Sequence, residues 1–134
     1  MISYQKINHL SCEDFIDVLE KSSLSERRPV NDVKCLQGMI DHSNLIIGAY
    51  HNHSLIGIAR AVTDFHYCCY LSDLAVSKEF QNQGVGKSLI NKAFHCLQPT
   101  CKLILLSAPS AEKYYPKIGF IRHESCWFTT KPLN

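Results

Sequence analysis

A glycine-containing turn near the middle of the chain separates two segments with different hydrophobic patterns. The segment Leu71–Val76 is apolar and strand-like, and the turn lies within Gln81–Gly86. After the turn, the apolar residues Val85, Leu89 and Ala93 recur at the spacing of one helix face. The pattern predicts a strand, a glycine loop and a helix N-terminus. Such an N-terminus presents unpaired backbone N–H groups and a partial positive charge, and glycines let a ligand approach closely, so this loop suits a phosphate or pyrophosphate.

Two common phosphate-binding motifs do not fit this loop. The phosphate-binding loop of nucleotide hydrolases needs a glycine five residues before Gly86, where Gln81 stands. The dinucleotide fingerprint needs a third glycine where Leu89 stands. A third pattern, Gln/Arg-x-x-Gly-x-Gly/Ala after an apolar strand, is matched by Gln81, Gly84 and Gly86.

The segment Leu71–Leu97 therefore resembles the acetyl-CoA-binding motif of the GNAT superfamily of N-acetyltransferases. A second segment, Ala111–Phe120, resembles the family's Ala-x-x-Phe-Tyr-x-x-x-Gly-Phe signature. A length of 134 residues predicts a single domain, and the resemblance implies that residues 1–134 form one acetyltransferase domain. It also implies an α/β fold, with a mixed, mostly antiparallel sheet that is flanked by helices and splayed at the central cofactor-binding strand.

The resemblance assigns the cofactor site to one strand and the loop that follows it. The strand residues Leu74, Ala75 and Val76 would contact the pantetheine arm through their backbone. The pyrophosphate would lie on the loop and the helix start, which comprise Gln81, Asn82, Gln83, Gly84, Val85, Gly86, Lys87 and Ser88. Lys87 is explained equally well as a solvated helix lysine.

Two residues are candidates for catalysis. Tyr115 matches the family's tyrosine that faces the cofactor sulfur, with a packed core tyrosine as the alternative. A tyrosine of pKa ~10 is a weaker acid than a thiol of pKa ~8.5, so a hydrogen bond to the departing thiolate is easier than full proton transfer. Tyr114 stands at the family's Phe position and is expected in the core. Asp73 lies beside the expected reaction centre, either as a base or water holder, or paired with Arg60 or Lys78.

The adjacent arginines Arg27 and Arg28 are the candidates for substrate binding. In the resembled family, the segment that contains them helps to build the acceptor site. Two arginines there could hold an anionic acceptor such as an amino acid, or they could belong to a solvated loop. The leading hypothesis is an enzyme that transfers acetyl from acetyl-CoA directly to a primary amine, with a small-molecule acceptor favoured over a protein amine. The alternatives are a non-catalytic acyl-CoA sensor of the same fold and a nucleotide binder, which Gln81 disfavours.

Composition excludes several other classes of protein. The formal net charge is +2, with 14 basic and 12 acidic residues spread along the chain, so there is no basic stripe for nucleic acid. No apolar run approaches the ~20 residues that span a bilayer, so no membrane association is expected. The N-terminus lacks the apolar centre of a signal peptide, which predicts a cytoplasmic protein. We expect a monomer or a homodimer.

The cysteines and histidines do not predict a metal site. Seven cysteines are an odd number, and in an unsecreted chain they are expected as free thiols. There is no Cys-x-x-Cys pair, and the histidines do not add zinc-ligand spacing. No metal is therefore expected, and direct attack by an amine requires none.

The hydrophobic pattern also predicts the order of elements. Ser11 is expected to cap the first helix, and Pro29 to begin the second, which runs to about Asp41. The apolar parity changes between Cys69/Leu71 and Leu74/Val76, which predicts a β-bulge near residues 72–74, unless this strand is buried on both faces. Strands are expected at residues 3–7, 45–50, 55–62 and 67–76, followed by a parallel strand at 103–106 and a final pair at 120–124 and 126–130. Two further helices are expected, one from Gly84 to Gln98 and one at residues 108–115.

Overall fold

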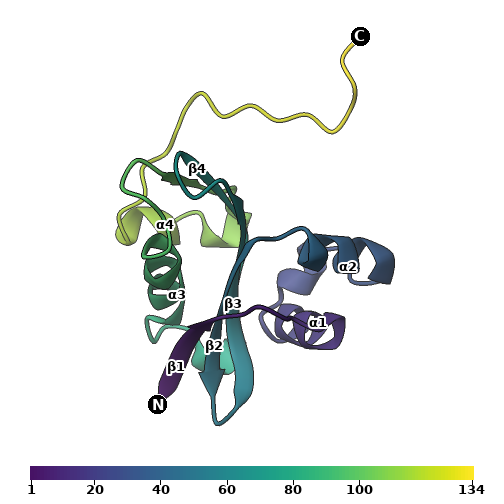
Figure 1. Cartoon of the computed structure of the whole chain (residues 1–134), viewed down its shortest axis with the longest axis vertical. Coiled ribbons are helices and arrows are strands. Elements are labelled where there is room, and N and C mark those ends of the chain that lie inside the picture. The colour runs from purple at the N-terminus through teal and green to yellow at the C-terminus, as the bar shows by residue number, and fades with distance from the viewer.

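The computed structural model describes residues 1–134, which form a five-stranded sheet with helices on both faces (Figure 1). The strands follow one another across the sheet in chain order. Every neighbouring pair is antiparallel except the last, which is parallel. The strands are β1 (Ile2–Lys6), β2 (Leu45–His51), β3 (Ser54–Thr63), β4 (Cys68–Val76) and β5 (Lys102–Ile104). The α-helices are α1 (Cys12–Lys21), α2 (Val33–Asp41), α3 (Val85–Phe94) and α4 (Tyr114–Lys117), with 3-10 turns η1 (Leu24–Arg27), η2 (Lys78–Phe80) and η3 (Pro109–Ala111).

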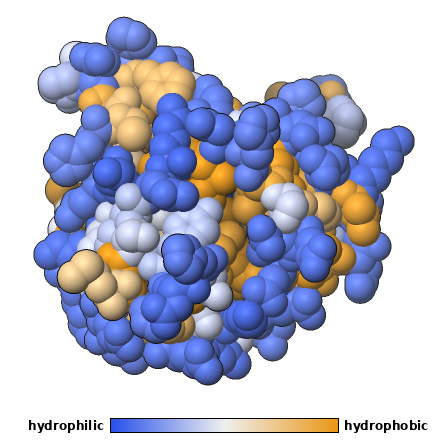
Figure 2. Space-filling model, turned by 60° about the horizontal axis from the view of Figure 1, so that its bottom comes forward, coloured by the Kyte–Doolittle hydropathy of each residue, from blue (hydrophilic) through white to orange (hydrophobic).

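Each face of the sheet carries its own hydrophobic core. Helices α1 and α2 cover one face, and α3 and α4 lie on the other side (Figure 1). Phe15 and Leu36 bring α1 and α2 into the first core, and Leu89 brings α3 into the second. The helices form with these faces because their apolar residues recur at helical spacing. On the face drawn in Figure 2, hydrophilic side chains dominate and apolar ones show between them.

The predicted β-bulge is present in β4. Arg60 pairs with Asp73 while Ala61 pairs with Leu71, so Ser72 is the extra residue. Cys69 and Leu71 therefore pack in the core on the α3 side, whereas Ala75 packs in the core on the α1 side. The parity change that the sequence shows is the direct consequence of this inserted residue.

The sheet opens beside the second half of β4, as the resemblance implies. β5 pairs with β4 only from Cys68 to Tyr70. The edge of β4 that faces away from β3 thus has no strand neighbour between Leu71 and Val76. The carbonyls of Ser72 and Val76 accept from the side chains of Arg28 and Gln81, and the other backbone groups of this segment that do not pair with β3 are available to a ligand.

The helix boundaries confirm some sequence predictions and correct others. Ser11 caps α1, since its Oγ accepts a hydrogen bond from the Asp14 N–H at 3.0 Å. The second helix does not begin at Pro29; it begins at Val33, because the side chain of Asp32 accepts from the Cys35 N–H and supplies the cap. The third ends at Phe94 rather than Gln98. The helix expected at 108–115 is split into η3 and α4.

The final pair of strands was predicted wrongly. No helix or strand follows α4, and after Phe120, which packs against Tyr115, the C-terminal end of the chain (yellow) runs away from the sheet (Figure 1). Ile121, Trp127 and Phe128 are exposed. Their residue types favour strands, but a strand forms only where a neighbouring strand supplies hydrogen bonds.

Candidate active site

The loop between β4 and α3 is held by its own side chains. Gln81 donates a hydrogen bond from Nε2 to the carbonyl of Val76 at 2.8 Å, which ties the loop to the end of β4. Gly84 occupies the cap position of α3 with φ +79°, a left-handed conformation that favours glycine. Because this cap has no side chain, nothing covers the first N–H groups of the helix from within the motif.

Two adjoining hollows lie around the open edge of β4. The larger is a cleft of about 560 Å³, a size typical of small-molecule sites. It is lined by the end of β4, the glycine loop, η1 and the segment from Ala108 to Tyr115. A smaller pocket of about 70 Å³ shares part of this lining. The residues that line both hollows are Leu24, Arg27, Leu74, Ala108, Ala111 and Tyr115.

Tyr115 lies at this junction of the two hollows. Its ring packs edge-on against Tyr114, with ring centres 5.2 Å apart, and against Phe120 at 5.4 Å. Burial, with a smaller contribution from Tyr114, raises the pKa of Tyr115 to about 12. The Tyr115 hydroxyl has no hydrogen-bond partner within the protein, so it is free to donate to a ligand.

Tyr114 was predicted to be a core residue, but it is only partly buried and lines the larger cleft. A Cβ atom at Gly86 would lie 2.7 Å from the Tyr114 hydroxyl oxygen. Gly86 therefore lets α4 approach the first turn of α3. Burial also raises the pKa of Tyr114.

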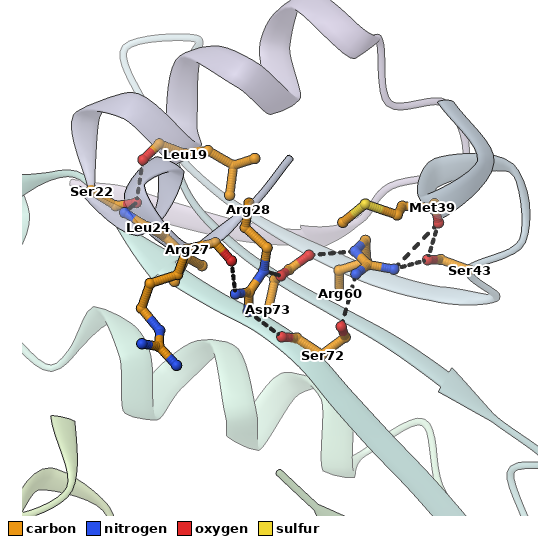
Figure 3. A network of polar contacts seen from close by, with 10 residues as sticks. All are labelled: Leu19, Ser22, Leu24, Arg27, Arg28, Met39, Ser43, Arg60, Ser72 and Asp73. Carbon is orange, nitrogen blue, oxygen red and sulfur yellow. Dashed lines mark hydrogen bonds and ion pairs between the residues drawn. The ribbon is translucent and has the colours of Figure 1, made fainter. Parts of the chain in front are cut away.

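Asp73 is completely enclosed by a network of polar contacts (Figure 3). One carboxylate oxygen accepts from Arg28 Nε at 2.5 Å, and the other pairs with Arg60 Nε. Arg60 also donates to Ser43 Oγ at 2.8 Å and to Ser72 Oγ at 2.9 Å, and Arg28 donates to the Ser72 carbonyl at 2.8 Å. Both oxygens of Asp73 are thus engaged, which agrees with the predicted pairing to Arg60 and does not support a role as base.

The two neighbouring arginines have different environments. Arg28 points into the network around Asp73, and its side chain is only 21% exposed. The Arg27 carbonyl accepts from Arg28, but the Arg27 guanidinium points away from the network (Figure 3) and makes no ion pair or hydrogen bond within the protein. Only Arg27 is therefore free to bind a substrate, although both residues were predicted to do so.

The arrangement of a bulged strand, an uncapped helix after a glycine loop and a tyrosine at the cleft agrees with a match of residues 6–128 to the model of the acetyltransferase (GNAT) domain. The chain belongs to the GNAT acetyltransferase family. Acetyl transfer is the activity of this family, and the mixed α/β fold inferred from the sequence is confirmed.

Proteins described as N-acetyltransferases resemble the chain at low sequence identity. The uncharacterized N-acetyltransferase ycf52 of Pyropia yezoensis is 27% identical over 125 residues, which cover 85% of this chain and 70% of that protein. The ycf52 protein of Gracilaria tenuistipitata var. liui is 27% identical and is covered over 66% of its length, against 84% of this chain.

Solved structures agree with the fold. A GNAT family acetyltransferase from Streptococcus pneumoniae superimposes with a TM-score of 0.77 at 22% identity, covering 98% of this chain and 100% of that one. The aminoglycoside N-acetyltransferase AAC(6')-Iy in complex with CoA gives a TM-score of 0.74 at 19% identity, covering 99% and 96%.

Most of the residues predicted to bind the cofactor line the cleft of this GNAT domain. These are Leu74, Ala75, Val76, Gln81, Asn82, Gly84, Val85 and Gly86. Gln83, Lys87 and Ser88 do not line it. Gln83 instead donates to the carbonyl of Glu79 at 3.3 Å.

Sequence reasoning missed other residues of the cleft, including Lys78, Ser110 and Tyr114. Tyr114 could have been recognised as a cleft residue, because it carries a hydroxyl at the position where the family has Phe. Nothing in the sequence marked Ser110, because its place depends on how the segment after β5 folds over the cleft.

The residues at the cleft fit a cofactor that carries a pyrophosphate and a long polar arm. The uncapped start of α3 and the left-handed Gly84 suit the phosphates, and Lys78 adds a positive charge to the lining. The free edge of β4 suits the amide groups of the arm.

Three further observations concern metal ligands, cysteines and membrane-spanning helices. No group of three or more His, Cys, Asp or Glu residues is placed to hold a metal ion. All the cysteines are free. No helix has both the length and the apolar character needed to cross a membrane.

Proposed function

We propose that this protein transfers the acetyl group of acetyl-CoA to the primary amine of a small molecule by direct attack. The observation that carries this proposal is the junction of two hollows at Tyr115 and Leu74, beside the uncapped start of α3. One hollow is large enough for a cofactor arm, and the other opens at the point where the thioester would lie. This geometry would bring the two proposed substrates together at one place.

The chain's own residues would hold acetyl-CoA mainly through backbone groups. The N–H groups of the loop and of the first turn of α3 would bind the pyrophosphate, because Gly84 leaves them uncovered. The free edge of β4 from Leu74 to Val76 would pair with the pantetheine amides as a strand does. A backbone N–H of this edge would also stabilise the developing oxyanion.

Tyr115 would donate a hydrogen bond to the departing sulfur. Its pKa of about 12 lies above that of a thiol, which is ~8.5, so full proton transfer to the thiolate would be uphill by roughly 5 kcal/mol. The same burial keeps the hydroxyl protonated, and it therefore remains a donor at every physiological pH. Charge on the sulfur grows during the reaction, so this bond is strongest in the transition state.

The attacking amine must be neutral, and Asp73 is not placed to take its proton. Both carboxylate oxygens of Asp73 are occupied by arginines. No histidine and no other carboxylate lines the smaller pocket. The proton of the ammonium group would therefore pass to solvent before or during attack.

Thermal melting and thiol release test this function together. Acetyl-CoA at a hundred times its dissociation constant should stabilise the folded state by about 2.7 kcal/mol, while ATP should not. Release of free thiol should then depend on an added amine. A protein that binds acetyl-CoA but acetylates no small or protein amine would be the sensor considered above, and absence of any shift at millimolar acetyl-CoA would refute the proposal.

The Gly84→Glu variant provides a matched test of the cofactor site. A carboxylate at this position would repel phosphates at the start of α3. The variant should lose some stability, because Gly84 has a left-handed backbone, but it should still fold and should lose the thermal shift by acetyl-CoA. The cytoplasmic location and the monomeric or dimeric state remain predictions from the sequence.

A further inference from the structure

We propose that the acceptor is an amine that also carries a carboxylate, and that Arg27 selects it. This inference rests on the proposed acetyl transfer and names the substrate class of the same site. It starts from the charges around the smaller pocket, in which Arg27 and Arg28 are the only charged residues of the lining.

The network beneath this pocket has an excess of positive charge. Asp73 supplies one negative charge, and Arg28 and Arg60 supply two positive charges. No other carboxylate pairs with either arginine. The network as a whole therefore carries one uncompensated positive charge close to the pocket wall.

Arg27 adds a second positive charge, and its position is fixed from both ends of η1. At the start of η1, Ser22 Oγ donates to the Leu19 carbonyl at 3.0 Å and accepts from the Leu24 N–H at 3.3 Å. At the end, Arg28 Nη1 donates to the Arg27 carbonyl at 2.7 Å while its Nε binds Asp73. The backbone of Arg27 is thus held where the two hollows meet, and its guanidinium is left without a partner.

The remaining walls of the smaller pocket are mostly apolar. Leu71, Leu105 and Leu106 line this pocket but not the larger cleft. A volume of about 70 Å³ accepts roughly five water-sized groups. The one free carboxylate nearby, Glu26, lines only the larger cleft. The pocket therefore fits an amine with a small apolar body and an anionic group within reach of Arg27, as in an aliphatic α-amino acid.

The same electrostatics disfavour polycationic acceptors. An aminoglycoside would bring several ammonium groups to a pocket that has two uncompensated positive charges and no free carboxylate. Although this chain shares its fold with aminoglycoside acetyltransferases, we do not expect aminoglycosides to be its acceptors.

The test compares acceptors that differ only in the anionic group. L-Leucine, L-leucinamide and isoamylamine share one apolar body, and neamine serves as the polycation. We expect kcat/KM for L-leucine to exceed that for the other acceptors by about 10- to 100-fold, the effect of a charge-assisted hydrogen bond. Arg27→Gln should remove this preference by raising KM for L-leucine, and Arg27→Lys should keep part of it. Arg122→Gln is the control, because Arg122 is exposed and lies outside both hollows, and it should leave the preference unchanged.

A second measurement keeps the inference testable without turnover. With CoA present, N-acetyl-L-leucine should raise the melting temperature of the protein more than N-acetyl-L-leucinamide does, and Arg27→Gln should abolish the difference. Equal responses to acid and amide would overturn the inference. So would an Arg27→Gln variant whose KM for acetyl-CoA rises equally with every acceptor, because Arg27 would then bind the cofactor.

These outcomes separate the inference from the proposed function. If the amines without a carboxylate are acetylated as well as L-leucine, acetyl transfer stands and the selection by Arg27 is wrong. If acetyl-CoA does not bind at all, the proposed function itself fails.

Discussion

Tyr115 is the residue whose hydroxyl the proposed chemistry needs. Tyr115→Phe removes a hydroxyl that has no partner in the protein, so the fold should survive. We expect kcat to fall about 10²-fold or more, with the affinity for acetyl-CoA little changed, because the bond strengthens as charge develops on sulfur. Tyr67→Phe, at an exposed tyrosine, is the control. An unchanged kcat in Tyr115→Phe, with chemistry shown to limit the rate, would remove Tyr115 from the mechanism.

The pKa of Tyr115 also predicts the pH profile. Burial raises this pKa to about 12, and the donor is the protonated form, which is fully present below that value. We therefore expect that deprotonation of Tyr115 does not lower kcat between pH 7 and pH 10. Any fall in kcat over this range should be the same in Tyr115→Phe. A basic limb below pH 10 that disappears in Tyr115→Phe would show that the pKa of this hydroxyl is lowered in the acetyl-CoA complex.

Asp73 is predicted to act in stability rather than in proton transfer. Asp73→Asn leaves Arg28 and Arg60 without their counter-charge, and removing one partner of a buried ion pair costs about 3–5 kcal/mol. Denaturant unfolding measures the loss. Asp17→Asn is the matched control, because Asp17 pairs with Lys21 on the surface and should contribute less than about 1 kcal/mol. If the two variants have equal stability, the network is not the support proposed here.

At the scale of elements, the predictable features were those encoded by neighbouring residues. The bulge at Ser72 was readable because Leu71 and Leu74 reveal which face each residue occupies. The cap at Ser11 and the loop before α3 are equally local. The contact between Arg28 and Asp73 was not predicted, because it joins residues 45 positions apart and depends on how η1 folds against β4.

The contact between α3 and α4 gives a prediction about Gly86. Gly86→Ala would place a methyl group 2.7 Å from the Tyr114 hydroxyl oxygen, a clash that costs about 1 kcal/mol because only the end of a side chain must move. Tyr114→Phe removes that oxygen, so the cost of Gly86→Ala should largely disappear in the double variant. Chemical denaturation of the four proteins gives the coupling energy. A penalty that is the same in both backgrounds would mean that Gly86 is required for another reason.

At the scale of the whole molecule, the fold leaves its last segment outside the two cores. Residues 121–134 form no helix or strand, and they include Trp127, which is 89% exposed and is the only tryptophan. Exposed apolar side chains in such a segment often mark a surface for association. β5 ends near exposed Ile104 and Leu106, so the sheet also has an incompletely covered edge.

Trp127 makes this segment directly observable. In dilute protein, its fluorescence should have the red-shifted emission of a hydrated indole and be quenched readily by acrylamide, because its side chain has no packing partner. Deleting residues 121–134 should then change the melting temperature little, since these residues bury almost no apolar area against the domain. A blue-shifted, protected emission at every protein concentration, with a destabilised deletion variant, would mean that the segment packs on its own sheet. Protection that appears only as concentration rises, in step with dimer formation in sedimentation experiments, would instead place the segment between two copies of the chain.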